Sequence, residues 1–445
     1  MTSSEPLSFL FTMAHLGGNV SPVMPVVRRL TDRGHRVRVM SDTVNRAEAE
    51  AAGARFVPWT VAPNRADRRR ELDLPDWDVG PQEGLAMVAR FLGETALAYA
   101  QDTRTELARE AADLVVCFDM LLGPMAGCEA QGQRLALLGT MISFFPLPGL
   151  PPLGSGLAPA RTEAERRDLA ARRAELHAVL DAGLPSLNEA RARLGLVPLA
   201  HLADQWEAAA LHWLGTARAF DFPEAELRPS MRYAGPLLGD PAWAAPWRSP
   251  WPAGDRRPLV LVGFSTSFQD HAGVLQRIID AAADLPVRLL VTLGGALEPH
   301  EVRAVANSVV VASAPHGAVM REAAAVVTHG GHGTVMAALM NRLPMLMIPH
   351  GRDQADNAVR VTERGAGLAL ERTAGTAEIR SALARLLGEP AFAAAARRLG
   401  DAVAAEARAS TLIEDLEALA ARAERKAVGS SPVTTPEPDR SPALQ

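Results

Sequence analysis

Residues 326–336 constrain the fold most, because their pattern indicates a strand, a glycine-rich turn and the start of a helix. Val326 and Val327 close an apolar run, as expected of a buried strand. Three glycines occupy the turn, and Thr334 opens a run to Met340 that can be helical. Such a turn directs backbone N–H groups and the positive end of a helix dipole at one point, which suits a phosphate or diphosphate. Taken alone, the pattern also fits a plain tight turn.

The same alternation of strands and helices runs through two long parts of the chain. In the first part we expect strands at 7–13, 36–40 and 55–58 with helices between them. A second series begins at residue 259, and its expected strands are 259–263, 287–292, 309–312, the strand before the glycine-rich turn, 345–348 and 368–370. This rhythm predicts an α/β fold with two Rossmann-like, doubly wound domains. Ligands bind at the carboxyl ends of parallel strands, so the loops at His15 and His329 can face each other across a cleft.

Composition along the chain sets the expected domain bounds. Tryptophans and prolines are concentrated between the two series, so we expect an N-terminal domain at 1–228, a linker at 229–258 and a C-terminal domain at 259–427. The last helix is expected to pack back on the N-terminal domain. Residues 428–445 are rich in Ser, Pro and Thr and are expected to be disordered.

Charge and cysteine content exclude several classes of protein. The net charge of −5 gives no electrostatic case for binding nucleic acid or an anionic membrane. Cys117 and Cys128 make neither a disulfide framework nor a metal pattern, which favours a reducing compartment. No apolar run reaches the length of a membrane span, and the first residues lack the pattern of a signal peptide. We therefore expect a cytoplasmic protein with no membrane span, and the sequence leaves a homodimer open.

Several short segments together resemble the nucleotide-sugar signature of family-one glycosyltransferases. They are Ser-Ala-Pro-His at 313–316, His-Gly-Gly-His-Gly-Thr at 329–334, Pro344, and the pair Asp353 and Gln354. The similarity is greatest to bacterial natural-product and macrolide-type enzymes of antibiotic biosynthesis, and it extends over about residues 7–423. It implies a GT-B fold and an inverting transfer from an NDP-sugar, UDP- or dTDP-linked, to a hydroxyl of an apolar small molecule. It also implies that no metal or other cofactor takes part.

The resemblance assigns a role to each matching residue of the C-terminal domain. These residues are Ser265 and Thr266 beside the diphosphate, Ser313 and His316 near the nucleotide base, His329 on the phosphates, Gly331, Gly333 and Thr334 completing that cradle, and Asp353 and Gln354 on the sugar hydroxyls. A histidine beside the diphosphate can stabilise the leaving group as its negative charge builds. Two positions depart from the pattern: Ala337 stands where a ribose-binding Glu is usual, and Arg342 where a Gly is usual. Ribose recognition is therefore unassigned, and Arg342 is either a surface residue or a new contact.

The acceptor side is less well defined. The resemblance places His15 as the base that deprotonates the acceptor and Asp119 as the carboxylate that orients it. A different alignment brings Gly17 or Asn19 to the position of the base, so Gly17, Gly18 and Asn19 are candidates for an acceptor loop. In that alternative His15 is an ordinary loop residue, and Asn19 positions the acceptor.

Two segments, 59–91 and 141–153, are expected to form the acceptor pocket, and 83–112 is expected to be one long helix.

Three other interpretations fit parts of the sequence. His316, His329, His332 and Asp353 could suggest a metal site, but their spacing matches no standard zinc pattern and lies in a glycine loop. A non-catalytic GT-B protein that holds a sugar nucleotide, as a helper of a partner glycosyltransferase, would not need sugar-hydroxyl partners such as Asp353. A sugar-nucleotide epimerase on the same fold would need a pair of acid/base carboxylates, and the sequence offers no convincing pair.

Overall fold

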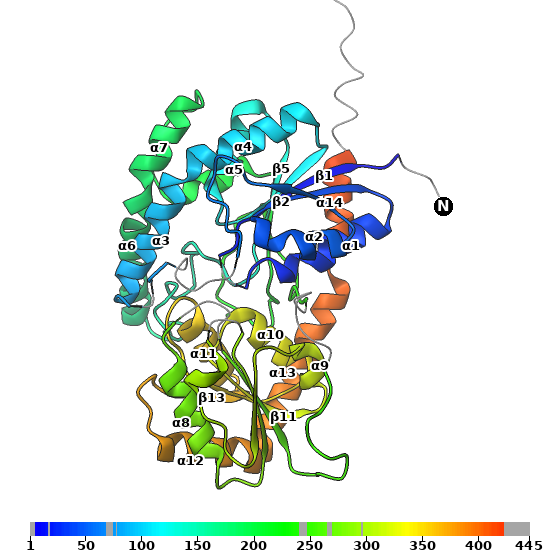
Figure 1. The fold of residues 1–445 in the computed structure, drawn as a ribbon. Coiled ribbons are helices and arrows are strands. Elements are labelled where there is room, and N and C mark those ends of the chain that lie inside the picture. The colour runs from blue at the N-terminus through cyan, green and yellow to red at the C-terminus, as the bar shows by residue number, and fades with distance from the viewer. Residues whose placement is uncertain are drawn as a thin grey trace, which may run out of the picture.

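The computed structural model describes residues 5–16, 18–67, 74–76, 78–239, 247–264, 269–294 and 297–421. These residues form two α/β domains, one above the other in Figure 1, each built around one parallel sheet. The chain therefore has the two-domain, doubly wound architecture that the alternation of strands and helices predicts.

The N-terminal sheet has the strand order β3-β2-β1-β4-β5-β6-β7. Its strands are β1 (Ser8–Thr12), β2 (Arg36–Ser41), β3 (Arg55–Pro58), β4 (Leu114–Phe118), β5 (Leu135–Leu138), β6 (Leu211–Leu214) and β7 (Met231–Tyr233). β1 and β4 are buried along their whole length, as continuous apolar strands covered on both faces should be. In the register, Phe9 lies opposite Val37 of β2 and Leu114 of β4. The strands are parallel, so the loops after β1, β2 and β4 emerge at the same edge.

Helices cover this sheet and extend the N-terminal domain. They are the 3-10 helices η1 (Ser21–Val23), η2 (Thr43–Asn45), η4 (Asp181–Gly183) and η5 (Leu202–Ala208), and the α-helices α1 (Met24–Asp32), α2 (Arg46–Ala51), α3 (Pro81–Glu94), α4 (Ala96–Arg109), α5 (Leu122–Gln131), α6 (Glu163–Leu180) and α7 (Leu184–Arg193). Thr162 and Glu165 form a capping box at the start of α6, which fixes where that charged helix begins.

The C-terminal sheet has the order β10-β9-β8-β11-β12-β13. Its strands are β8 (Leu259–Gly263), β9 (Arg288–Thr292), β10 (Ser308–Val311), β11 (Ala323–Thr328), β12 (Met345–Met347) and β13 (Gly367–Ala369). Its helices are α8 (Ala272–Ala282), η6 (Pro299–Glu301), α9 (His316–Met320), α10 (His332–Met340), α11 (Gln354–Thr362), α12 (Thr376–Gly388), α13 (Pro390–Ala409) and α14 (Leu412–Ala421). The reversal of strand order at β8 and β11 leaves a crevice at the carboxyl ends of these strands.

Two expectations about the elements need correction. β7 lies inside the segment expected to be a linker, yet it pairs with β6, so the N-terminal sheet continues past residue 228. The segment expected to be one helix at 83–112 is two helices, α3 and α4, separated at Thr95. The Thr95 hydroxyl donates to the Phe91 carbonyl at 2.7 Å, a local bond that competes with regular helix geometry.

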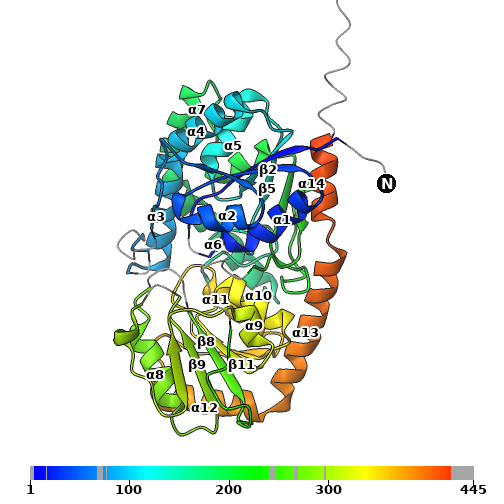
Figure 2. The same ribbon diagram turned by 45° about the vertical axis from the view of Figure 1, so that its right-hand side comes forward.

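Buried polar contacts join the two domains. Arg360 of α11 forms an ion pair of 2.7 Å with Asp221, which follows β6, and both side chains are almost fully buried. The Arg360 guanidinium also lies over the Phe222 ring. α13 runs along one side of the molecule and leads to α14, which contacts α1 and β4 of the N-terminal domain (Figure 2). In the part of the chain that the structure describes, no helix has the length and apolar character needed to cross a membrane.

Candidate active site

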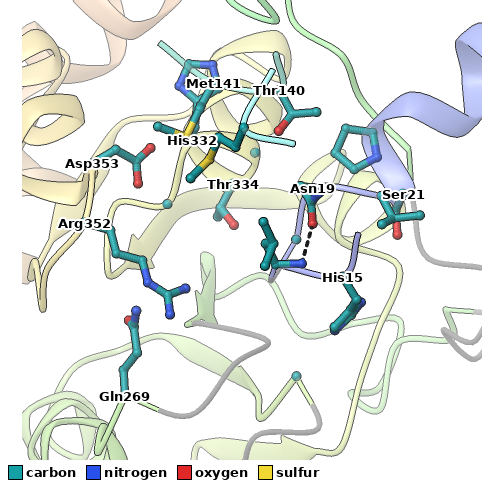
Figure 3. A pocket seen from close by; sticks show the side chains of 18 of the residues that line it. His15, Asn19, Ser21, Thr140, Met141, Gln269, His332, Thr334, Arg352 and Asp353 are labelled. Carbon is teal, nitrogen blue, oxygen red and sulfur yellow. Dashed lines mark hydrogen bonds between the residues drawn. The ribbon is translucent and has the colours of Figure 1, made fainter. Parts of the chain in front are cut away.

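A cavity of about 1070 Å³ lies between the carboxyl edges of the two sheets. The N-terminal domain lines it with the loops after β1, β2, β4 and β5, and the C-terminal domain with the loops after β8 to β13. Figure 3 shows His15, Asn19 and Ser21 on one side, and Thr334, Arg352 and Asp353 on the other. The cavity is therefore shared by both domains, at the edge where α/β sheets bind ligands.

The glycine-rich turn after β11 has the geometry of an anion site. Gly330 has φ +93°, a left-handed conformation that favours glycine, and a Cβ on Gly331 would lie 2.6 Å from Nε2 of His329. α10 begins at His332, two residues before the expected start at Thr334. The backbone N–H groups of residues 332–334 therefore belong to the first helical turn, have no partner within the helix, and lie on residues that line the cavity.

His329 is held neutral by its surroundings. Its side chain is buried, and its Nδ1 lies 3.3 Å from the Thr328 hydroxyl. Burial, assisted by His271, His350 and Arg352, lowers the pKa of His329 from 6.5 to about 3. Before a ligand binds, His329 therefore offers a neutral imidazole to the cavity.

The pair Asp353 and Gln354 lies at the start of α11 and lines the cavity. Oδ2 of Asp353 accepts a hydrogen bond of 2.8 Å from the Asn357 amide. Oε1 of Gln354 accepts from the backbone N–H of His350 at 2.7 Å, and its Nε2 donates to Gln269 at 3.0 Å. The Gln354 side chain thus stabilises the loop that precedes it, and it has a second amide N–H that can donate to a ligand.

The residues assigned to the nucleotide base also reach the cavity. Ser313 and His316 line it, and Nε2 of His316 lies 2.9 Å from the Thr292 hydroxyl. Ser265 and Thr266 fall outside the described residues, so their assignment to the diphosphate stays a prediction.

The expected pairing of His15 with Asp119 is wrong in this structure. The Asp119 carboxylate lies 3.2 Å from Nε2 of His212 on β6 and is fully buried, whereas Nδ1 of His15 lies 3.3 Å from Oδ1 of Asn45. His15 and Asn45 line the cavity, but Asp119 does not belong to its described lining. The physical reason is that β6, which the sequence interpretation had missed, places a closer partner beside Asp119.

Asn19 and Gly18 line the cavity, and Gly17 falls outside the described residues. The Asn19 side chain is already engaged in its own loop. Its Oδ1 accepts from the Leu16 N–H at 3.0 Å, and its Nδ2 donates to the Ala14 carbonyl at 2.9 Å. Asn19 therefore shapes the loop after β1, and the alternative in which it positions the acceptor has less support than the sequence suggested.

The N-terminal half of the cavity has an apolar wall. The described apolar lining from the two expected segments and their neighbours is Pro63, Leu74, Val79, Leu85, Val88, Phe91, Leu92, Phe118, Met120, Met141, Phe144 and Leu153. Carboxylates lie among them, at Asp42, Glu48, Asp67 and Asp76. This half suits a largely apolar molecule that carries polar groups at its edge.

Several residues that line the cavity were not predicted from the sequence. Arg352 forms a two-bond ion pair with Asp76 of the N-terminal domain, at 2.7 and 2.8 Å. Asn341 lies one helical turn after Ala337 and also lines the cavity, a spacing of four residues that could have identified it as a ribose partner. Arg342 pairs with Asp401 at 2.7 Å on the surface, which resolves the open choice for this residue.

Among the described residues, no cluster of three His, Cys, Asp or Glu side chains is placed to hold a metal ion.

Comparison with known proteins agrees with this geometry. Residues 276–419 match the family model described as Erythromycin biosynthesis protein CIII-like, C-terminal domain. The chain is 29% identical over 412 residues to 4'-demethylrebeccamycin synthase of Lentzea aerocolonigenes, a match that covers 90% of this chain and 97% of the relative. It is 39% identical over 154 residues to elloramycin glycosyltransferase ElmGT of Streptomyces olivaceus, covering 33% of this chain and 37% of that protein.

Solved structures show the same fold. The glycotransferase of kitacinnamycin superposes with a TM-score of 0.72 at 20% identity, over 93% of this chain and 99% of the other. The calicheamicin glycosyltransferase CalG4 superposes with a TM-score of 0.70 at 20% identity, over 94% of this chain and 99% of the other. The architecture is therefore the GT-B fold.

The curated relatives that the chain matches are named natural-product glycosyltransferases, so the comparisons define its class as a glycosyltransferase. Over residues 276–419 the chain matches the erythromycin biosynthesis protein CIII-like family model, and over most of its length it is similar to natural-product glycosyltransferases.

Proposed function

We propose that the protein transfers a sugar from a UDP- or dTDP-linked donor to a hydroxyl of an apolar small molecule, with inversion at the anomeric carbon and without a metal. The observation that carries this proposal is the shared cavity, which joins the glycine-rich turn of one domain to the apolar wall of the other. A donor and an acceptor bound in these two halves would lie next to each other.

The C-terminal half provides the means to stabilise a departing diphosphate. The first turn of α10, the neutral His329 and the guanidinium of Arg352 surround one region of the cavity. Preorganised N–H donors and a cation stabilise negative charge as it develops on a leaving group, so no metal is needed for that step. Asp353 and the second amide N–H of Gln354 are suited to sugar hydroxyls, and Asn341 is our candidate for the ribose.

The N-terminal half provides a base and a binding surface. His15 takes the proton of the acceptor hydroxyl while the oxygen attacks the anomeric carbon. The bond from that carbon to the diphosphate breaks, and its electron pair leaves with the diphosphate. Attack on the face opposite the leaving group inverts the configuration. The apolar wall selects an acceptor such as a macrolide, polyketide or aromatic aglycone, and exclusion of water from the closed cavity limits hydrolysis of the donor.

Product formation tests this proposal. Purified protein is incubated with UDP-glucose or dTDP-glucose and a panel of apolar acceptors, with EDTA present, and products are analysed by mass spectrometry and NMR. We expect a glycoside whose anomeric configuration is opposite to that of the donor. A retained configuration, or a requirement for a divalent cation, would contradict the mechanism.

A second candidate is a non-catalytic GT-B protein that holds a sugar nucleotide for a partner glycosyltransferase. The observation that favours it is that Asp119 pairs with His212, so Asp119 is not placed to orient His15 as the family resemblance implies. Hydrolysis of the donor by the isolated protein, lost in His15→Ala, would exclude this candidate. Tight binding of the nucleotide with neither transfer nor hydrolysis would favour it.

A further inference from the structure

We propose that Asn45, and not Asp119, is the positioning residue that orients His15 for proton abstraction. This inference rests on the proposed function, because it takes His15 as the base. It adds a residue that the family signature does not assign.

Adjacent strands bring the two residues together. β1 and β2 pair in parallel, with Thr12 opposite Met40, so the loop that carries His15 and η2, which ends at Asn45, emerge side by side. Asn45 is fully buried yet lines the cavity, and its Oδ1 lies 3.3 Å from Nδ1 of His15.

A second hydrogen bond engages the nitrogen of the Asn45 amide. Its Nδ2 donates to Oγ of Ser41 at 3.0 Å, and Ser41 is itself fully buried. In this arrangement the amide oxygen faces His15, and an amide oxygen can only accept a hydrogen bond. Nδ1 of His15 then carries the ring proton, and Nε2 carries the lone pair that a base requires.

The backbone of His15 is held from the same segment. Its N–H donates to Oδ2 of Asp42 at 2.7 Å, and Oδ1 of Asp42 accepts from the Arg65 N–H at 2.7 Å. Residues 41–45, at the end of β2 and just after it, thus hold both the main chain and the ring of His15. A ring held at both points loses little freedom when the acceptor binds, which is how a positioned base gains efficiency.

Asp119 is held elsewhere. Its carboxylate contacts His212, and its carbonyl oxygen accepts a hydrogen bond of 2.6 Å from the Trp206 indole. These contacts hold Asp119 within the packing between β4, β6 and η5, away from the described lining of the cavity. Asp119 therefore contributes to the fold of the N-terminal domain.

An amide partner has a chemical consequence. The Asn45 amide selects the tautomer of His15 without itself adding a negative charge at Nδ1.

The test combines ring nitrogen NMR with pH profiles. Protein with ¹⁵N-labelled histidine is compared for wild type, N45A and N45D, and the His15 signals are assigned with H15Q. We expect Nδ1 to carry the proton in wild type and a mixture of tautomers in N45A.

With a phenolic acceptor, kcat should fall about ten- to a hundredfold in N45A. N45D places a carboxylate at the same point, so the acid limb of kcat/KM should move up by about one pH unit. Asp42, Glu48 and Arg65 also line the cavity and are unchanged in all variants.

The matched control is D119N. The acid limb of kcat/KM in D119N should stay at the wild-type pH, because the Asp119 carboxylate pairs with His212. The inference is overturned if Nδ1 of His15 is unprotonated in wild type, since the amide would then lie the other way. It is also overturned if D119N moves the acid limb while N45D does not. Failure of the proposed function looks different: H15A would keep wild-type transfer, or no acceptor would be glycosylated. The NMR experiment needs no acceptor and still decides the role of Asn45.

Discussion

The two halves of the cavity are built in different ways. In the C-terminal half, called the donor half here, the candidate residues lie in two short continuous runs, 329–334 and 350–354. In the N-terminal half, called the acceptor half, His15, Asn45 and Phe118 lie at or just after the carboxyl ends of three different strands. The geometry of a contiguous run is set largely by its own residues. The geometry of residues at several strand ends depends instead on which strands are neighbours in the sheet.

The halves also differ in charge. Three histidines, the buried His271 and His329 and the partly buried His350, surround the Phe264 ring in the donor half, with ring centroids 5.6 to 5.9 Å away. Burial lowers the pKa of each of them. The acceptor half instead contains carboxylates. Neutral donors near the expected diphosphate and anionic groups near the expected acceptor separate the two binding tasks.

The largest effect is expected where the halves are joined. Arg360→Ala leaves the buried Asp221 carboxylate without its ion partner and should lower the free energy of unfolding by about 3–5 kcal/mol. Urea denaturation measures this change. Arg385→Ala is the matched control, because Arg385 pairs with Glu389 on the surface and its loss should cost less than about 0.5 kcal/mol. Equal effects of the two substitutions would show that the Arg360–Asp221 ion pair does not stabilise the assembly of the two domains.

The next largest effect distinguishes the two halves of the cavity by the ligand whose binding each substitution weakens. His329→Ala removes a buried hydrogen-bonding group at the expected diphosphate and should weaken binding of the nucleoside diphosphate about ten- to a hundredfold. Calorimetry measures the affinity. Met141→Ala, in the apolar wall, should raise KM for the acceptor and leave the nucleotide affinity within about twofold. Unchanged nucleotide affinity in His329→Ala would remove His329 from the donor site.

The pH dependence of stability should come mainly from the donor half. The unfolded chain takes up protons on histidine below about pH 6.5, whereas burial lowers the folded pKa of His271 and His350 to about 4 and of His329 to about 3. Stability from these groups is therefore present above pH 6.5 and is lost as the pH falls toward 4. Asp356 acts in the opposite direction, because burial raises its folded pKa from 3.8 to about 6. We expect a net loss of about 2–3 kcal/mol per pH unit between pH 6 and pH 5.

Urea curves at pH 7, 6 and 5 measure this slope. In Asp356→Asn the opposing group is removed, so the loss of stability on acidification should become steeper. A slope that does not change with Asp356→Asn would mean that this carboxyl does not titrate as its burial implies.

The smallest effect concerns Arg342. Its φ of +60° is a left-handed conformation that costs a residue with a Cβ about 1 kcal/mol, and glycine is the usual residue of the family here. Arg342→Gly relieves that cost and loses an exposed ion pair, so it should stabilise the protein by about 0.5 kcal/mol. Arg342→Ala keeps the conformation and loses the pair, so its melting temperature should be lower than that of Arg342→Gly. The reverse order would show that the backbone at this position is not strained.

The sequence predicted the donor half better than the acceptor half. The alternation of strands and helices predicted two doubly wound domains, and the structural relatives confirm the GT-B fold. The glycine-rich turn was placed correctly after β11 because its signal is local. Even there, the helix start at His332 differed from expectation, since glycine and histidine are weak helix formers whose place is set by the surrounding structure.

The acceptor half depended on contacts between distant residues. His15 and Asn45 meet only because β1 and β2 are neighbours, and Asp119 meets His212 only because β6 joins the sheet beside β5. β6 and β7 have only four and three residues, which are too few to show a clear alternation of apolar and polar residues. Without those strands, the sequence could not show that Asp119 already had a partner.

The central claim is that the C-terminal half of the cavity binds a nucleoside diphosphate without a metal. Calorimetric titration of the purified protein with UDP, dTDP, UDP-glucose and dTDP-glucose, with and without EDTA, tests it most directly. We predict micromolar binding of one of the two diphosphates, with the same affinity in EDTA. Failure of every nucleotide to bind, or binding that EDTA abolishes, would contradict the account.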